Sequence, residues 1–310
     1  MDAAHPSPIP TLFDLQVNGF AGVDFQDPAL DAASLRRAVE SLHAHHTGHI
    51  LLTLISDDLD ALARQFERIE GLRSRDPLIA QTICGYHLEG PFLSPLPGFC
   101  GAHPPEVQQA PSLAAFTRLQ DAANGRIRLV TLAPEWPGSP EFIAALHARG
   151  VLVSLGHTDA SDAHIDDAIR AGARLCTHLG NGTPQLLHRH DNIVQRLLAR
   201  DELTACLIPD GVHLPPAVLR NFFRAKPPGK TLLTTDAMAA AAAPPGRYRI
   251  GRSEVESRDG VVRVPGQPNF AGSCLTPDAG VRNAARWLGI PEPEARALFS
   301  SRVADFFPLP

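Results

Sequence analysis

The segment IRLVTLAPEWPGSPEFIAALHARGVLVSLGH, Ile127–His157, holds the pattern that decides the fold. It opens with an apolar run at Ile127–Leu132, continues into a helix-period stretch at Pro140–Arg149, and returns to an apolar run at Val151–Leu155. Apolar runs without polar alternation are typical of parallel strands that are buried on both faces. The segment therefore predicts one strand–helix–strand unit.

The same unit repeats on both sides of this segment. Further strands are predicted at Leu12–Val17, Ile50–Ile55, Thr82–His87, Leu175–Thr177, Leu203–Ile208 and Thr231–Thr235. Further helices are predicted at Ala33–His46, Leu59–Arg73, Ser161–Ala171 and Ala217–Arg224. Eight strands with intervening helices indicate an α/β protein with a (β/α)₈ TIM barrel. A doubly wound open sheet is the competing architecture, but no G-x-G-x-x-G motif opens a helix after the first strand.

Length and composition narrow the class of protein. A chain of 310 residues is long for one domain, but α/β barrels commonly reach this size. Because 44% of the residues are hydrophobic and 20% are charged, the chain has an ordinary globular composition. The formal net charge of −5 argues against a nucleic-acid-binding surface.

The cysteines and the N-terminal segment bear on the compartment. The five cysteines are odd in number, far apart in the sequence and never form a C-x-x-C pair, which favours reduced thiols over a disulfide framework. The N-terminal MDAAHPSPIP has neither a basic region nor an apolar stretch, so it does not resemble a signal peptide. No run approaches the roughly 18 apolar residues of a membrane span. A cytoplasmic protein without a membrane partner is expected.

Two segments interrupt the strand–helix rhythm. Pro91–Pro105 is too rich in proline and glycine for a helix and predicts a long ordered loop. Residues 247–264, with an Asp259-Gly260 turn between alternating runs, predict a β-hairpin inserted after the eighth strand. Since the hairpin is an excursion, we expect a single catalytic domain over residues 1–310.

Polar residues follow five of the predicted strands directly, where a barrel carries its catalytic groups. They are Glu89 after the third strand, His157 after the fifth, His178 after the sixth, His213 after the seventh and Asp236 after the eighth. A single such histidine is more often a structural residue. Five polar residues at one end of the predicted barrel indicate an active site.

The chemistry of these side chains points to metal-dependent hydrolysis. Glu89, His157 and His178 supply one carboxylate and two imidazoles, a ligand set that suits one divalent metal ion with an open position for water. Zn²⁺ is the expected ion, with Fe²⁺ or Mn²⁺ as alternatives. Asp236 is then placed to accept a proton from water and to pass it to a leaving group.

The other histidines are less informative. His103 in the long loop, and His213 taken alone, are each as consistent with loop structure as with a substrate contact. Seven others lie at the terminus or on helical and peripheral segments, where we expect structural or solvent-facing roles: His5, His43, His45, His46, His49, His147 and His164.

Eight short motifs in register resemble the N-acetylglucosamine-6-phosphate deacetylase family of the amidohydrolase superfamily. In chain order they are DLQVNGFAGVDF, HLEGPF, GAHPPE, GHTDA, THLGNG, DGVHL, TTDAM and FAGSCLT, from Asp14 to Thr276. The resemblance implies a TIM-barrel metal hydrolase that removes acetate from an amino-sugar phosphate. It implies that Glu89, His157 and His178 hold the metal and that Asp236 is the general base and acid.

The same resemblance implies roles for the substrate-binding residues. His103 matches a residue that helps to polarise the acetamide carbonyl, and His213 matches one that contacts the sugar. Asn181 and the backbone at Gly182 match the part of the site that meets the phosphate. Arg189 matches an arginine that reaches the phosphate in the neighbouring subunit, which implies a homodimer. An arginine suits that position because its planar guanidinium meets two phosphate oxygens at once.

Gln16 and Asn18 occupy positions where many amidohydrolases carry a histidine pair for a second metal. Carboxamides are poor ligands for Zn²⁺, so one metal per subunit is expected. This substitution is itself typical of the deacetylase family.

The sequence departs from the family in two places. Relatives carry a small β-sandwich built from both chain ends, whereas this chain starts almost at the first predicted barrel strand and ends at 304–310, so the sandwich is expected to be absent. The segment after His178, LGNGTPQLLHRHDN, also differs from the family's usual version, which puts phosphate specificity in doubt. Two alternatives therefore stay open: a deacetylase of another N-acetylated sugar or N-acyl compound, and an inactive sugar-phosphate-binding relative.

Overall fold

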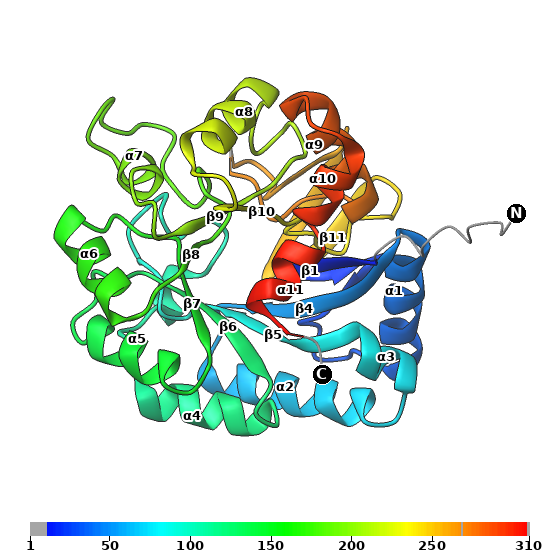
Figure 1. The fold of residues 1–310 in the computed structure, drawn as a ribbon. Helices are drawn as coiled ribbons and strands as arrows, with labels where there is room; N and C mark the ends of the chain where they lie inside the picture. The colour runs from blue at the N-terminus through cyan, green and yellow to red at the C-terminus, as the bar shows by residue number, and fades with distance from the viewer. Residues whose placement is uncertain (1–10, 268, 309–310) are drawn as a thin grey trace, which may run out of the picture.

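The computed structural model describes residues 11–267 and 269–308 and contains an eight-stranded parallel barrel (Figure 1). The strands neighbour one another in the order β1-β4-β5-β6-β7-β8-β9-β10. Their bounds are β1 Leu12–Val17, β4 Thr47–Ile55, β5 Ile83–Glu89, β6 Ile127–Leu132, β7 Leu152–Leu155, β8 Leu175–Cys176, β9 Thr204–Leu207 and β10 Thr231–Leu233. Each overlaps one predicted strand, so the (β/α)₈ architecture is confirmed.

The barrel closes between its first and last strands by an irregular seam. Val17 forms an isolated parallel bridge with Ala237, just beyond β10, and the backbone N–H of Asn18 donates to the Ala237 carbonyl. At the other end of the seam, the backbone N–H of Phe13 donates to the carbonyl of Phe299. Because the backbone groups along the seam find partners in this way, β1 and β10 are joined without a continuous ladder.

Helices surround the strands, and some of them begin at a residue whose side chain caps the helix. Asp31 caps α1 by accepting the backbone N–H of Ser34, and Ser161 forms a capping box with His164 at the start of α6. The bounds are α1 Ala32–Ala44, α2 Leu59–Arg73, α3 Pro77–Thr82, α4 Leu113–Ala122, α5 Ser139–His147, α6 Asp162–Ala171, α7 Ile193–Leu198, α8 Pro216–Ala225, α9 Pro277–Leu288, α10 Glu292–Ala297 and α11 Ser301–Phe306. A 3₁₀ turn, η1, spans Pro105–Val107 at the end of the predicted loop.

The C-terminal helix α11 lies against the amino-terminal ends of the strands (Figure 1). Val303 and Phe307 are buried there against Phe13 and Leu15 of β1. The guanidinium of Arg128 lies 5.6 Å from the centre of the Phe307 ring. This end of the barrel is therefore filled by apolar side chains.

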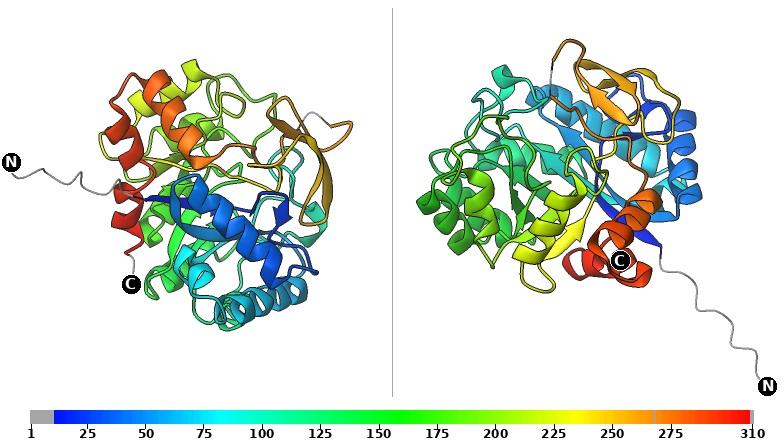
Figure 2. Two further views of the ribbon diagram at one scale, coloured as in Figure 1. Left: turned by 90° about the vertical axis from the view of Figure 1, so that its right-hand side faces the viewer. Right: turned by 90° about the horizontal axis from the view of Figure 1, so that it is seen from above.

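A three-stranded antiparallel sheet follows the barrel where the sequence predicts a hairpin over residues 247–264. Its strands are β11 Gly246–Ile250, β12 Ser253–Arg258 and β13 Val261–Arg263. The predicted hairpin with its Asp259-Gly260 turn is present as β12 and β13, and a second turn at Gly251-Arg252 adds β11 as a third strand. The sheet packs through Ile250, Val255 and Val262 onto Ile55 and Met238. Seen from above in Figure 2, this yellow and orange sheet lies beside the blue N-terminal part of the chain.

The described residues contain one further pair of strands, β2 Gly19–Phe20 with β3 Val23–Asp24, and no sandwich flanking the barrel is found among them. The segment MDAAHPSPIP, with His5, lies outside the described residues, as do residues 309 and 310. Over the described ranges, no helix is both long and apolar enough to cross a membrane.

Candidate metal centre and active-site pocket

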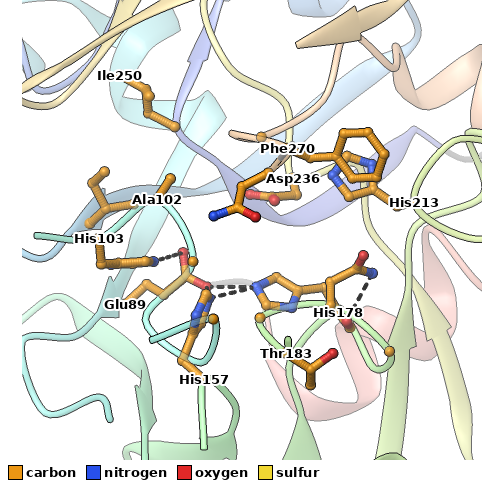
Figure 3. A pocket seen from close by; sticks show the side chains of 18 of the residues that line it. Glu89, Ala102, His103, His157, His178, Thr183, His213, Asp236, Ile250 and Phe270 are labelled. Atoms are coloured by element: carbon orange, nitrogen blue, oxygen red, sulfur yellow. Dashed lines mark hydrogen bonds and ion pairs between the residues drawn. The ribbon is translucent and has the colours of Figure 1, made fainter. Parts of the chain in front are cut away.

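The polar residues predicted after the strands meet in one pocket at the carboxyl end of the barrel (Figure 3). Glu89 is the last residue of β5, His157 and His178 each come two residues after β7 and β8, and Asp236 comes three residues after β10. The four side chains line a cavity of about 350 Å³. Pockets of this size commonly bind small molecules.

Three of these residues have unusual backbone conformations. The φ angle is +53° at His157, +26° at His178 and +51° at Asp236, in or near the left-handed region that side chains other than glycine rarely occupy. Such strain persists where the surrounding structure enforces it, and it concentrates at functional sites. Here it occurs where each chain segment leaves its strand and its side chain enters the pocket.

Glu89, His157 and His178 form the group that could hold a metal, with ligand atoms all within 4.8 Å of one another. Nε2 of His178 lies 2.9 Å from Oε1 of Glu89, and Nε2 of His157 lies 3.4 Å from the same oxygen. The two Nε2 atoms are 3.2 Å apart. Ligands about 2.0–2.1 Å from a tetrahedral Zn²⁺ lie roughly 3.3 Å from one another, so these separations fit a shared ion.

The hydrogen bonds around His157 favour this use. Its Nδ1 lies 2.8 Å from the carbonyl oxygen of Phe99, to which it donates. The proton is then on Nδ1 and the lone pair on Nε2, which is the form of histidine that binds metals.

Burial and charge shift the pKa values at this site. For Glu89, burial alone would raise the pKa, but hydrogen bonds with His157 and His178 outweigh it and hold the pKa well below its usual range. For Asp236, burial and then the nearby negative charge of Glu89 raise the pKa to about 7. Two carboxyl groups with well separated pKa values are typical of sites where one binds a cation and the other moves a proton.

His103 enters the pocket from the long loop and faces Glu89. Its Nδ1 accepts the backbone N–H of Ser56 at 3.3 Å and lies 2.9 Å from the Ser56 hydroxyl. Burial, followed by the neighbouring His157, lowers its pKa to about 3. A neutral His103 with a filled Nδ1 carries its proton on Nε2, which lies 3.8 Å from Oε2 of Glu89. It can therefore donate a hydrogen bond into the pocket.

Of the four other residues predicted to bind the substrate, three line the pocket and one does not. His213, Asn181 and Gly182 line the pocket. His213 is held by Asp210, whose Oδ2 lies 2.6 Å from its Nδ1, and its ring packs 4.9 Å from that of Phe270. Arg189 is exposed on the loop after β8 and does not line the pocket of its own chain.

Several residues of the site were missed by reasoning from the sequence. Ser56, directly after β4, orients His103, and applying the strand-end rule to the second strand would have found it. Asp210 orients His213 and lies three residues before it. Phe270 and Ile250 form apolar walls of the pocket, and no local pattern marks them.

Gln16 and Asn18 lie beside the carboxylates. Nε2 of Gln16 donates to Oε2 of Glu89 at 3.0 Å and to Oδ1 of Asp236 at 2.9 Å. Nδ2 of Asn18 donates to the same Asp236 oxygen at 2.7 Å.

Comparison with known proteins gives a consistent result. The N-acetylglucosamine-6-phosphate deacetylase of Bacillus subtilis (strain 168) is 32% identical over 280 residues, which are 89% of this chain and 69% of that protein. The human deacetylase of the same name is 37% identical over 290 residues, covering 90% of this chain and 69% of its own length. The chain belongs to the N-acetylglucosamine-6-phosphate deacetylase family.

Solved structures of the family agree with this assignment. The N-acetyl-D-glucosamine-6-phosphate deacetylase of Mycobacterium smegmatis, solved as a mutant in complex with N-acetyl-D-glucosamine-6-phosphate, is 33% identical with a TM-score of 0.87. It covers 99% of this chain and 82% of its own. A second sugar also occurs among the relatives, because the N-acetylgalactosamine-6-phosphate deacetylase of Escherichia coli O157:H7 is 35% identical over 92% of this chain and 74% of its own length. No protein-family profile matches the chain.

Proposed function

We propose that this protein is a metal-dependent amidohydrolase that converts N-acetylglucosamine 6-phosphate to glucosamine 6-phosphate and acetate. The observation that carries the proposal is the cavity in which a Glu/His/His group, Asp236 and a neutral His103 face one another, in a chain that belongs to this family. Glu89, His157 and His178 are the proposed ligands of one divalent ion per subunit. Zn²⁺ is preferred because the ligand set is one carboxylate and two imidazoles, and Fe²⁺ or Mn²⁺ are the alternatives.

The protein's own groups have distinct tasks in this reaction. The bound ion would supply Lewis-acid activation of water and of the amide carbonyl. Asp236 takes the proton of the attacking water and delivers it to the departing amine nitrogen. The Nε2–H of His103 donates to the carbonyl oxygen as negative charge develops there. His213 contacts the sugar hydroxyls, and Asn181 and the backbone at Gly182 meet the phosphate.

We further propose that the active form is a homodimer, in which the partner's Arg189 completes the phosphate site. This is supported by the exposure of Arg189 outside its own pocket and by Leu186 on the same loop, which is 92% exposed. The measurement is the oligomeric state in solution together with Arg189→Ala. We expect a raised KM for the phosphorylated substrate and little change for the unphosphorylated sugar.

The chain is proposed to work as one catalytic domain in the cytoplasm. Its barrel strands run from Leu12 to Leu233, and the C-terminal helices return to β1. The five cysteines are unpaired in the structure, as expected in a reducing compartment.

A different sugar is the second candidate function, because one relative carries the name of an N-acetylgalactosamine-6-phosphate deacetylase. The deciding experiment measures acetate release from N-acetylglucosamine 6-phosphate, N-acetylgalactosamine 6-phosphate and unphosphorylated N-acetylglucosamine. Each substrate is assayed with the protein as isolated, after chelation, and after Zn²⁺ is restored.

The proposal predicts turnover that is fastest on N-acetylglucosamine 6-phosphate, lost on chelation and regained with metal. Faster turnover of the galacto-configured sugar would replace the proposed substrate. Equal activity on the unphosphorylated sugar would contradict the proposed phosphate-binding site. Metal binding without turnover on all three would favour another N-acyl substrate, and absence of both would favour an inactive sugar-phosphate-binding protein.

A further inference from the structure

We infer that Gln16 and Asn18 are positioning residues whose carboxamides fix how Asp236 and Glu89 face the pocket. The inference rests on the proposed deacetylation for its reaction, but the contacts that carry it involve only side chains of this chain. Gln16 is fully buried in β1, and Asn18, just beyond that strand, is 4% exposed.

The two carboxamides divide the oxygens of the carboxylates into held and free atoms. Both donate to Oδ1 of Asp236, at 2.9 and 2.7 Å. Among the described residues no hydrogen bond reaches Oδ2, so Oδ2 is the oxygen left to accept a proton. At Glu89, Gln16 occupies Oε2, while Oε1 faces the Nε2 atoms of His157 and His178. The carboxamides therefore leave one oxygen for proton transfer and one for the proposed metal.

The orientation of both carboxamides is unfavourable for their own carbonyl oxygens. The side-chain carbonyl oxygens of Gln16 and Asn18 are buried and have no hydrogen-bond partner among the described residues. An unpaired buried carbonyl oxygen is unfavourable, and turning either amide over would instead place that oxygen against a carboxylate. The carboxylates thus decide the orientation, which indicates a role in the site beyond ordinary packing.

The contacts predict different consequences for the two residues. Within the described ranges, the only side-chain hydrogen bond of Asn18 goes to Asp236, so its loss should impair proton transfer and leave the metal ligands in place. Gln16 touches both Asp236 and Glu89, so its loss should impair proton transfer and also weaken metal binding. A role confined to packing would not separate these two effects.

The experiment compares Asn18→Ala and Gln16→Met with Gln65→Met as a matched control. Gln65 is another buried glutamine, but its amide donates to the backbone carbonyls of Phe25 and Asp27, away from the pocket. For each variant we measure kcat, KM, the thermal midpoint, and the affinity for Zn²⁺ by competition with a chelator.

We expect Asn18→Ala to lower kcat about 10–100-fold, the range typical of outer-shell partners, with KM and Zn²⁺ affinity within threefold of wild type. Gln16→Met should lower both kcat and Zn²⁺ affinity at least tenfold. Gln65→Met should lower only the thermal midpoint. Asn18→Ser, which restores a donor, should regain part of the lost kcat.

Two results would overturn the inference: kcat within threefold of wild type in folded Asn18→Ala, or equal loss of Zn²⁺ affinity in Asn18→Ala and Gln16→Met. If Gln16→Met does not fold, the Asn18 variants carry the test through kcat and its recovery. If wild type itself shows no turnover, the proposed function fails, and the difference in Zn²⁺ affinity still decides the positioning role.

Discussion

Burial raises the pKa of two aspartates, Asp236 and Asp14, that differ in their place in the structure. Burial is the main cause that raises the pKa of both carboxyl groups, to about 7 for Asp236 and about 6 for Asp14. Asp236 lines the pocket, whereas Asp14 is fully buried beneath it, where it accepts hydrogen bonds from the hydroxyls of Thr234 and Thr235. Asp236 is the proposed proton-transfer group, whereas Asp14 supports the end of β10.

Replacing Asp236 by asparagine tests its role as the proton-transfer group. Asp236→Asn keeps the shape of the side chain and an oxygen for Gln16 and Asn18, but it cannot carry a proton from water to the amine. We expect kcat to fall by about 10²–10⁴-fold while bound metal stays near wild type, measured by acetate release and elemental analysis. Turnover within tenfold of wild type would contradict the assignment of Asp236 as the proton-transfer group.

Asp14 predicts a pH dependence of stability. Its folded-state pKa, raised from 3.8 to about 6, means that the folded protein holds the proton more tightly than the unfolded chain. Its contribution to stability is therefore complete below pH 4 and is lost as pH rises through 6, by about 3 kcal/mol at most. Asp14→Asn lacks this titration, so the gap in unfolding free energy between wild type and variant should shrink from pH 4 to 7.

The control for this measurement is Asp31→Asn. Asp31 is an exposed helix cap whose pKa is lowered by the backbone N–H of Ser34, and asparagine caps a helix about as well. A gap that shrinks equally for Asp31→Asn would contradict the assignment to Asp14.

At the scale of elements, the loop after β8 and the long loop after β5 together hold His157. The carbonyl of Phe99 accepts the Nδ1 proton of His157. Gly182 approaches the same ring so closely that a Cβ there would lie 2.7 Å from Nδ1. Only glycine fits this approach, and its φ of +62° also favours glycine.

Gly182→Ala should therefore disturb the proposed metal ligand rather than the fold. We expect a loss of Zn²⁺ affinity of about tenfold or more, measured by chelator competition, because the new methyl group displaces His157. The matched control is Gly150→Ala, with φ of +72° and no atom near its added Cβ. Gly150→Ala introduces the backbone strain without a new contact. An equal loss of Zn²⁺ affinity in both variants would show that backbone strain, and not the contact of the methyl group with His157, is responsible.

The elements also show how far the sequence could predict the structure. The eight strands could be predicted because parallel strands that are buried on both faces have continuous runs of apolar residues. The polar residues that follow these strands then indicated the pocket residues Glu89, His157, His178 and Asp236. Six helices were not predicted. Four of them, α3, α7, α10 and α11, have six residues each and are too short to show a helical period, whereas α4 and α9, with ten and twelve residues, were missed despite their length. Contacts such as Ser56 with His103, or Gln16 with both carboxylates, join residues far apart in the chain, and no local pattern records them.

At the scale of the whole molecule, the two ends of the barrel have separate tasks. The carboxyl end holds the pocket, while the amino end is filled by α11 and the apolar side chains under it. Barrels commonly separate catalysis and stability in this way. The separation predicts that damage at one end leaves the other intact.

Phe307→Ala tests this separation. The ring is 1% exposed and packs 6.1 Å from that of Phe13, so its removal should cost about 3–5 kcal/mol of unfolding free energy. Below the lowered melting temperature, kcat and KM should match wild type. Exposed Pro308→Ala serves as the control with little effect on stability. A reduced kcat in folded Phe307→Ala would show that the two ends are coupled.

The left-handed backbone at His157, His178 and Asp236 has a consequence for how this protein can be improved. Each such residue costs on the order of 1 kcal/mol, and glycine would relieve it. A library of variants selected only for thermal stability would therefore be enriched in changes at these three positions, and the proposed roles of the three residues predict that the selected variants lose activity. A selection for more thermostable variants must therefore also measure turnover, because changes that relieve this strain also alter the proposed active site.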